Sequence, residues 1–200
     1  MTDYFALLAE ARRPWLEPEK LKEKYHALSR AAAPDAELNE AFRVLSDPKL
    51  RLHHLLTLEG ADLTAGRPVP PSVAELFWNT GTLLREAERW LLQNKATTSA
   101  LARALLEPER GKLQQRLGKL EEQLNATFDT ELARLPRAEV DWPNEIAQMV
   151  ERYDSIAYLT RLLEQTAEKR FQLAVQPLPH WWLRASAFSR TCSHAHSRAT

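Results

Sequence analysis

This sequence of 200 residues has one cysteine, five glycines and no formal net charge, and each of these features argues against a class of protein. The single cysteine, Cys192, leaves no pair for an internal disulfide or a Cys-x-x-Cys metal site. The five glycines form no G-x-G-x-x-G or G-x-x-x-x-G-K-[ST] phosphate-binding loop, and so few argue against a sheet-rich fold. The 27 basic and 27 acidic residues give a formal net charge of zero, which excludes a chain-wide basic surface for nucleic acid.

Long hydrophobic runs are absent as well. No segment approaches the roughly 18 uncharged apolar residues that identify a membrane-spanning helix. Residues 1–10 lack the basic region and apolar run that mark a secretory signal. We therefore expect a cytoplasmic protein with no membrane partner. Hydrophobic residues still make up 44% of the chain, which is enough for a globular core.

Apolar residues recur at helical spacing along most of the chain, and no segment has the convincing pattern of a strand. We expect an all-α fold: a short helical hairpin domain at 1–60, a linker at 61–71, and an antiparallel three-helix bundle at 72–174. The spacing and the prolines predict helices at about 3–8, 19–31, 36–46, 49–58, 72–93, 99–106, 108–135 and 144–173.

Two helix starts in the bundle are predicted from particular residues. Ser72 and Glu75 have the spacing of a capping box, and Pro108 suits the first turn of a helix. The tryptophans at 15, 78, 90 and 142 are expected in the core. The predicted inward stripes of the bundle are Val73, Leu76, Thr80, Leu83, Ala87 and Trp90, then Leu113, Leu117, Leu120, Leu124, Phe128 and Leu135, then Ile146, Met149, Tyr153, Ile156, Leu163 and Ala167.

The last residues of the chain differ from the rest in composition. No Asp or Glu follows Glu168, and the segment contains Trp181 and Trp182 with arginines but no regular amphipathic spacing. We expect 175–200 to be a disordered tail. The alternative is a tail that touches a membrane or a partner through tryptophan and arginine.

Four sequence blocks follow one another in the first 48 residues: Asp3-Tyr-Phe-Ala-Leu-Leu8, Leu21-Lys-Glu-Lys-Tyr-His-Ala-Leu-Ser29, Pro34-Asp35 and Glu40-Ala-Phe-Arg-Val-Leu-Ser-Asp-Pro48. In this order they resemble the J domain of DnaJ-type co-chaperones. The next block, Lys49-Leu-Arg-Leu-His-His-Leu-Leu-Thr-Leu-Glu-Gly60, is similar to the HscB branch, the iron–sulfur assembly co-chaperones. That branch continues with a three-helix C-terminal domain, and 72–173 fits this layout by helix count.

The resemblance implies that 1–60 is a J-like domain whose partner is a DnaK-type, ATP-driven chaperone. J domains dock through a basic second helix and a His-Pro-Asp turn, and they stimulate ATP hydrolysis by the partner. A cationic stripe steers and orients the domain against an acidic surface. The matching chaperone-binding residues here are Lys22, His26, Arg30, Pro34 and Asp35, with Lys20 and Lys24 nearby.

Two departures from the J-domain pattern concern the turn. Ala33 stands where the family has histidine, and alanine has no side-chain donor, acceptor or titratable group. The segment between Asp35 and the next helix is also shortened, because Ala36 alone separates Asp35 from Glu37. In a second alignment the true turn is missing and Pro34-Asp35 matches by chance. Under either alignment we expect ATPase stimulation to be weak or lost.

No constellation of residues indicates catalysis, so we expect no enzyme activity and no cofactor or metal. Adjacent helical residues diverge, which makes His53-His54 a poor chelate and favours a surface or packing role. The leading hypothesis is a co-chaperone for protein folding or iron–sulfur cluster protein assembly, with a scaffold or other client bound by the C-terminal bundle. The alternative is a helical scaffold protein with a J-like fold that no longer couples to the chaperone.

Overall fold

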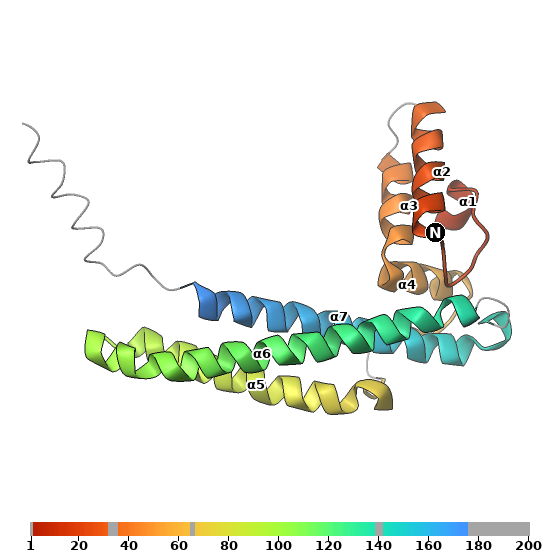
Figure 1. Cartoon of the computed structure of the whole chain (residues 1–200). Helices are drawn as coiled ribbons and strands as arrows, with labels where there is room; N and C mark the ends of the chain where they lie inside the picture. The colour runs from red at the N-terminus through yellow and green to blue at the C-terminus, as the bar shows by residue number, and fades with distance from the viewer. Residues whose placement is uncertain (1, 32–35, 65–66, 139–141, 176–200) are drawn as a thin grey trace, which may run out of the picture.

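The computed structural model describes residues 2–31, 36–64, 67–138 and 142–175 of the chain, and every regular element in these ranges is helical. The prediction of an all-α fold is confirmed. Figure 1 shows an L-shaped molecule, in which α2 and α3 stand upright at one end of a long helical bundle. The elements are α1 (Tyr4–Leu7), α2 (Pro18–Ala31), α3 (Ala36–Ser46), α4 (Pro48–Leu58), α5 (Pro71–Ala96), α6 (Ala100–Arg134), two 3-10 turns (Pro136–Ala138 and Trp142–Asn144), and α7 (Ile146–Ala174).

The N-terminal unit forms because short polar residues start its helices and apolar residues face inward. Asp3 caps α1 by accepting hydrogen bonds from the amides of Phe5 (3.0 Å) and Ala6 (3.3 Å). Asp47 caps α4 in the same way, with Pro48 at its first position. The buried core residues of the unit include Phe5, Leu8, Leu16, Leu21, Leu38, Ala41, Leu45, Leu55 and Leu56.

The bundle consists of α5, α6 and α7, which run along one another (Figure 1). The predicted stripes are buried or half-buried except at Ala167, which is exposed. Trp78 is also exposed, at 68%, so its prediction as a core residue is wrong. Leu159, Leu162 and Leu173 are buried instead of Ala167, because they continue the inner face of α7. Ion pairs join the helices at Arg116–Glu86, Lys169–Glu88 and Arg170–Glu121.

The predicted capping box at Ser72 is wrong. α5 begins at Pro71, since a proline at the first helical position needs no hydrogen-bond partner for its nitrogen. Ser72 therefore lies inside the first turn, and its Oγ is 3.2 Å from Oγ of Ser155 on α7. The side chain joins two helices of the bundle and does not cap one.

The predicted break before Pro108 is also wrong. α6 runs without interruption from Ala100 to Arg134 and is capped by Ser99, whose Oγ accepts from the amide of Ala102 (3.4 Å). Pro108 lies inside it at an exposed position. The proline has no amide hydrogen for the helix, and the turn just before it is held to α5, where Trp90 Nε1 donates to the Leu106 carbonyl (3.1 Å).

The hairpin unit and the bundle share apolar contacts. Trp142 and Met149, at the start of the α7 region, are buried in the same cluster as Phe5 of α1. Leu52 of α4 is buried with Ile156 of α7. The segment between α4 and α5 is held to α7 as well, since Arg67 donates two hydrogen bonds of 2.6 Å to the carboxylate of Asp154. In the described residues, no helix is long and apolar enough to cross a membrane.

Gly60 ends α4 in a left-handed turn with a φ of 72°. Its amide donates to the Thr57 carbonyl (3.1 Å), and the Ala61 amide donates to the Leu56 carbonyl (2.9 Å), which is the hydrogen-bond pattern of a Schellman motif. Only glycine adopts this backbone conformation without steric cost.

The Gly60→Ala substitution is therefore expected to lower the free energy of unfolding by about 1 kcal/mol, measured by urea denaturation. No atom lies within 4 Å of the added Cβ, so backbone strain is the whole cause. Gly111 is the matched control because it is helical and equally open. Gly111→Ala is expected to raise stability by about 0.5–1 kcal/mol. Equal effects of the two substitutions on stability would contradict the left-handed turn at Gly60.

Candidate functional site

The hairpin of α2 and α3 is held together along the inner face of α2. Leu21 is buried, and Tyr25 stacks on Phe42 of α3 with ring centroids 4.3 Å apart. The Tyr25 hydroxyl also donates to Oδ1 of Asn39 (2.8 Å). These contacts fix the rotation of α2 about its axis, so they determine which of its residues face outward.

The outer face of α2 carries Lys22, His26 and Arg30 at successive turns of the helix, and all three side chains are exposed. Arg30 donates from Nε to the His26 carbonyl (3.1 Å), which leaves its terminal nitrogens available to a partner. Within the described part of the chain, no carboxylate forms an ion pair with any of these three residues. We call Lys22, His26 and Arg30 the α2 basic stripe.

Two neighbouring lysines are engaged elsewhere. Lys20 pairs with Glu17 at 2.6 Å. Lys24 pairs with Glu10 at 2.8 Å and donates to the Ala9 carbonyl (2.9 Å). The carboxylate of Glu10 is almost fully buried, with 5% of its side chain exposed, so Lys24 binds the loop between α1 and α2 to the hairpin. The structure thus separates Lys24 from the α2 basic stripe.

The remaining predicted site residues lie in the connection between α2 and α3. Pro34 and Asp35, together with Ala33, fall outside the described residues. α2 ends at Ala31 and α3 begins at Ala36, so four residues join the two helices. The role of Pro34 and Asp35 stays a prediction.

The sequence analysis missed Arg51, which lies at the base of the hairpin. Its side chain on α4 is buried, and it donates from Nε to the Pro14 carbonyl (3.0 Å) and from Nη1 to the Leu45 carbonyl (2.7 Å). The guanidinium lies 5.9 Å from the ring centre of Trp15. Burial lowers its pKa to about 10, so the group is charged at neutral pH. Arg51 therefore connects the last turn of α3, α4 and the loop before α2.

His54 joins α4 to α1. It is buried, its Nε2 accepts a hydrogen bond from the Tyr4 amide (3.1 Å), and its ring stacks on Tyr4 with centroids 4.6 Å apart. Burial lowers the pKa of His54, and the Asp3 carboxylate opposes this effect without cancelling it. Its neighbour His53 is exposed. The sequence did contain a signal for this burial. Arg51 and His54 stand among leucines in Leu50-Arg-Leu-His-His-Leu-Leu56, where apolar residues occupy more than one face of the helix.

Stability is expected to fall as the pH decreases below about 6.5, where histidine in the unfolded chain begins to bind a proton. The folded pKa is lower, so the unfolded state binds more protons in that range. Protonation of Nε2 also removes the acceptor of the Tyr4 amide, at a cost of about 1 kcal/mol. Urea denaturation at pH 7.5 and 5.5 measures the loss. His54→Gln should reduce the pH dependence more than His53→Gln, the matched substitution of its exposed neighbour. The reverse ranking would refute the role of His54.

No metal centre is formed by the described residues, in which no group of three or more His, Cys, Asp or Glu side chains could hold an ion. The arrangement suits protein recognition. It presents an exposed basic helix face on a hairpin whose base is held by Arg51.

No family model and no curated protein matches the sequence. The structure is similar to a solved structure, the chaperone HscB from Vibrio cholerae, with a TM-score of 0.56 and 17% sequence identity. The match covers 86% of this chain and 99% of that chain. At this identity the similarity concerns the fold and does not extend to particular residues of the turn. The chain therefore has an HscB-like, all-α fold over most of its length.

Proposed function

We propose that this chain is a co-chaperone that docks on a DnaK-type chaperone in its ATP-bound state and has no catalytic activity of its own. The observation that carries the proposal is the α2 basic stripe, which is exposed on a hairpin within an HscB-like fold. Exposed cations steer a partner with an acidic surface and set its orientation. The proposed contact residues are Lys22, His26 and Arg30, together with Pro34 and Asp35.

The coupling between docking and ATP hydrolysis is weak or lost in this proposal. Ala33 has no side-chain group that can replace the histidine of the family motif. The four residues between α2 and α3 also leave no room for the longer loop found in J domains. Docking through the α2 basic stripe needs neither feature, so binding and stimulation are separable.

The C-terminal bundle supplies a second surface for a client. The resemblance to the HscB branch supports a scaffold of iron–sulfur cluster assembly, or another protein substrate, as that client. α5, α6 and α7 form a separate apolar core of their own. The bundle can therefore present a client while the hairpin contacts the chaperone.

Two measurements on the full chain with a purified DnaK-type chaperone test the proposal. We expect ATP-dependent binding in surface plasmon resonance, and single-turnover ATP hydrolysis that is stimulated far less than by a J protein with an intact His-Pro-Asp turn. Absence of ATP-dependent binding would refute docking. Stimulation as strong as that of the reference J protein would refute the impaired coupling.

The second candidate function is a helical scaffold uncoupled from the chaperone. Ala33 and the short connection favour it, because both affect the turn on which ATPase stimulation depends. In that case an iron–sulfur scaffold or another client would bind the bundle equally well with and without the chaperone. The binding measurement distinguishes the two functions, since only the co-chaperone binds in an ATP-dependent manner.

A further inference from the structure

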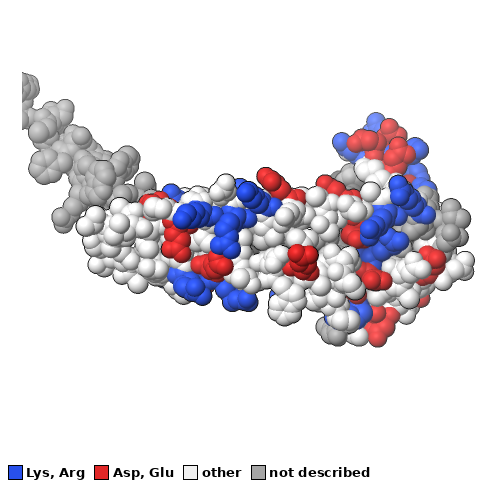
Figure 2. All heavy atoms as spheres, turned by 60° about the horizontal axis from the view of Figure 1, so that its bottom comes forward, with Lys and Arg blue, Asp and Glu red and all other residues white. Residues whose placement is uncertain are grey.

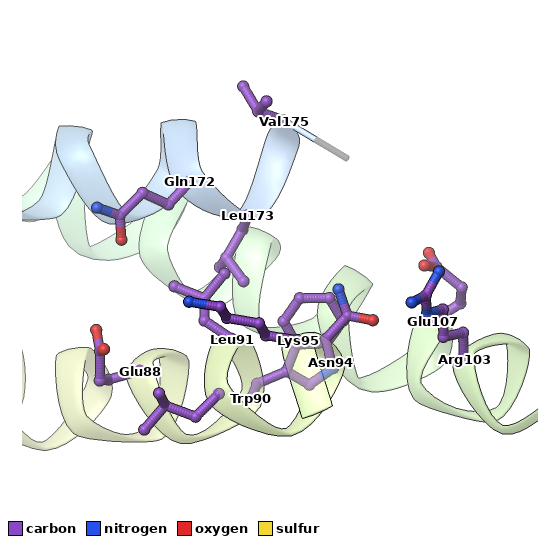
Figure 3. A pocket seen from close by; sticks show the side chains of 11 residues that line it. Glu88, Trp90, Leu91, Asn94, Lys95, Arg103, Glu107, Gln172, Leu173 and Val175 are labelled. Atoms are coloured by element: carbon purple, nitrogen blue, oxygen red, sulfur yellow. The ribbon is translucent and has the colours of Figure 1, made fainter. Parts of the chain in front are cut away.

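Two hollows of the bundle differ in the chemistry of their lining. The larger one, of about 600 Å³, lies where the last turns of α5 and α7 meet the first turns of α6. Figure 3 shows Trp90 and Leu91 on α5 facing Leu173 on α7, with charged side chains of both signs around them. This mixture of apolar, acidic and basic side chains does not define one class of ligand.

The smaller hollow, of about 270 Å³, is lined by polar and charged residues alone. It lies between the first turns of α7, the last turn of α6 and the first turn of α5. One face of α7 supplies much of the lining, through Gln148, Glu151, Arg152 and Ser155. Because no apolar residue lines this hollow, hydrogen bonds and charge must supply the affinity for a ligand.

Two of the four charged side chains in the smaller hollow satisfy each other, and two do not. Glu131 on α6 is only 4% exposed and accepts a hydrogen bond from Arg134 (2.7 Å). Within the described residues, the Glu151 carboxylate and the Arg152 guanidinium have no hydrogen-bond or ion-pair partner, and Nε of Arg152 is fully buried. A buried donor without a partner is costly, so this group calls for a ligand or a water molecule.

A pair of hydroxyl groups adds an acceptor to the smaller hollow. Ser155 Oγ donates to the Glu151 carbonyl (3.0 Å) and lies 3.2 Å from Oγ of Ser72 on α5. Because the Ser155 proton is used on that carbonyl, the Ser72 hydroxyl is the donor of the pair and keeps lone pairs of its own. The hollow therefore presents an unused cation beside an unused anion and a hydroxyl acceptor.

We propose that the smaller hollow binds a small zwitterion of the amino-acid type. The ligand carboxylate accepts hydrogen bonds from Arg152, including its buried Nε–H, and the ligand ammonium donates to Glu151 and Ser72. The planar fork of arginine matches a carboxylate with two parallel hydrogen bonds.

The charge balance of the site favours a zwitterion over a simple ion. The hollow has two arginines and two glutamates in its lining, so its formal charge is zero before and after a zwitterion binds. A ligand with a single charge would leave either Arg152 or Glu151 without a partner. Figure 2 shows basic and acidic side chains interspersed along the bundle, so the wider surface does not favour a ligand of one sign.

Titration of the full chain with L-serine tests the proposal, with the Arg152 Nε–H resonance followed by proton–nitrogen NMR and assigned through Arg152→Lys. β-Hydroxypropanoate lacks the ammonium of L-serine, and ethanolamine lacks its carboxylate. We expect L-serine to shift the Arg152 resonance and to bind at least roughly tenfold more tightly than either analogue. Equal binding of β-hydroxypropanoate would show a simple anion site, and no shift with millimolar L-serine would show a hollow that holds only water. Either result would overturn the proposal, and neither depends on chaperone docking.

Two pairs of substitutions assign the two charges, with binding followed at the backbone amides of 148–155. Arg152→Gln should weaken L-serine binding roughly tenfold, whereas Arg161→Gln, at an exposed position of the same helix, should leave it unchanged. Glu151→Gln should remove the preference for L-serine over β-hydroxypropanoate, and the exposed control Glu164→Gln should keep it. This preference is a ratio of two affinities within one variant, so a general loss of stability does not mimic its change. Equal losses in the two arginine variants, or an unchanged preference in Glu151→Gln, would overturn the proposal.

Discussion

The Arg51→Ala chain is expected to unfold with a free energy about 3 kcal/mol lower than that of the unmodified chain. The substitution removes the donors to the Pro14 and Leu45 carbonyls and leaves a cavity beneath Trp15. The Leu45 carbonyl belongs to the last turn of α3, where the helix dipole favours a cation. Urea denaturation followed by tryptophan fluorescence and far-UV circular dichroism measures the loss.

Arg43→Ala is the matched control for this substitution. Arg43 is exposed on α3 and pairs with Glu40 three residues earlier at 2.6 Å, so its removal should change stability by no more than about 0.5 kcal/mol. Both substitutions remove one positive charge, and a difference between them therefore reports burial. Arg51→Lys should lie between the two, because lysine can donate to one carbonyl but lacks the fork that reaches both. A loss at Arg51 no larger than at Arg43 would show that the base of the hairpin does not depend on the guanidinium.

The helices were predictable because apolar spacing alone determines their existence and their inner faces. Leu21 and Tyr25 share the inner face of α2, so Lys22 and His26, each the next residue along the chain, were expected on the outer face. The structure shows both of them exposed. The same argument identified the stripe of α5 from Val73 to Trp90. Helical periodicity is a local property, and local properties can be read from one sequence.

Contacts between residues far apart in the chain could not be predicted in this way. The pairing of Lys24 with Glu10 depends on how the loop after α1 returns to α2. The burial of Arg51 depends on a carbonyl 37 residues away at Pro14. The attachment of α6 to α5 just before Pro108 depends on Trp90, whose indole donates to the Leu106 carbonyl 16 residues away. In each case tertiary packing overrides a local preference.

The Lys22→Glu/Arg30→Glu chain is expected to bind the ATP-bound DnaK-type chaperone at least roughly tenfold more weakly than the unmodified chain. The two substitutions replace attraction by repulsion at the ends of the α2 basic stripe, and both positions are exposed. The free energy of unfolding should therefore change by less than about 0.5 kcal/mol. Surface plasmon resonance at low and high salt measures the effect, which should be concentrated in the association rate and diminish as salt increases.

The matched control is Lys112→Glu/Lys119→Glu on α6, where both lysines are exposed. It changes the net charge of the chain by the same amount but leaves the hairpin unaltered. If steering depended on total charge alone, the two double variants would lose affinity equally, and the α2 basic stripe would have no special role. A loss confined to Lys22→Glu/Arg30→Glu would identify the outer face of α2 as the docking surface. This result does not require the turn at Ala33, because the stripe acts through charge and orientation before any effect on hydrolysis.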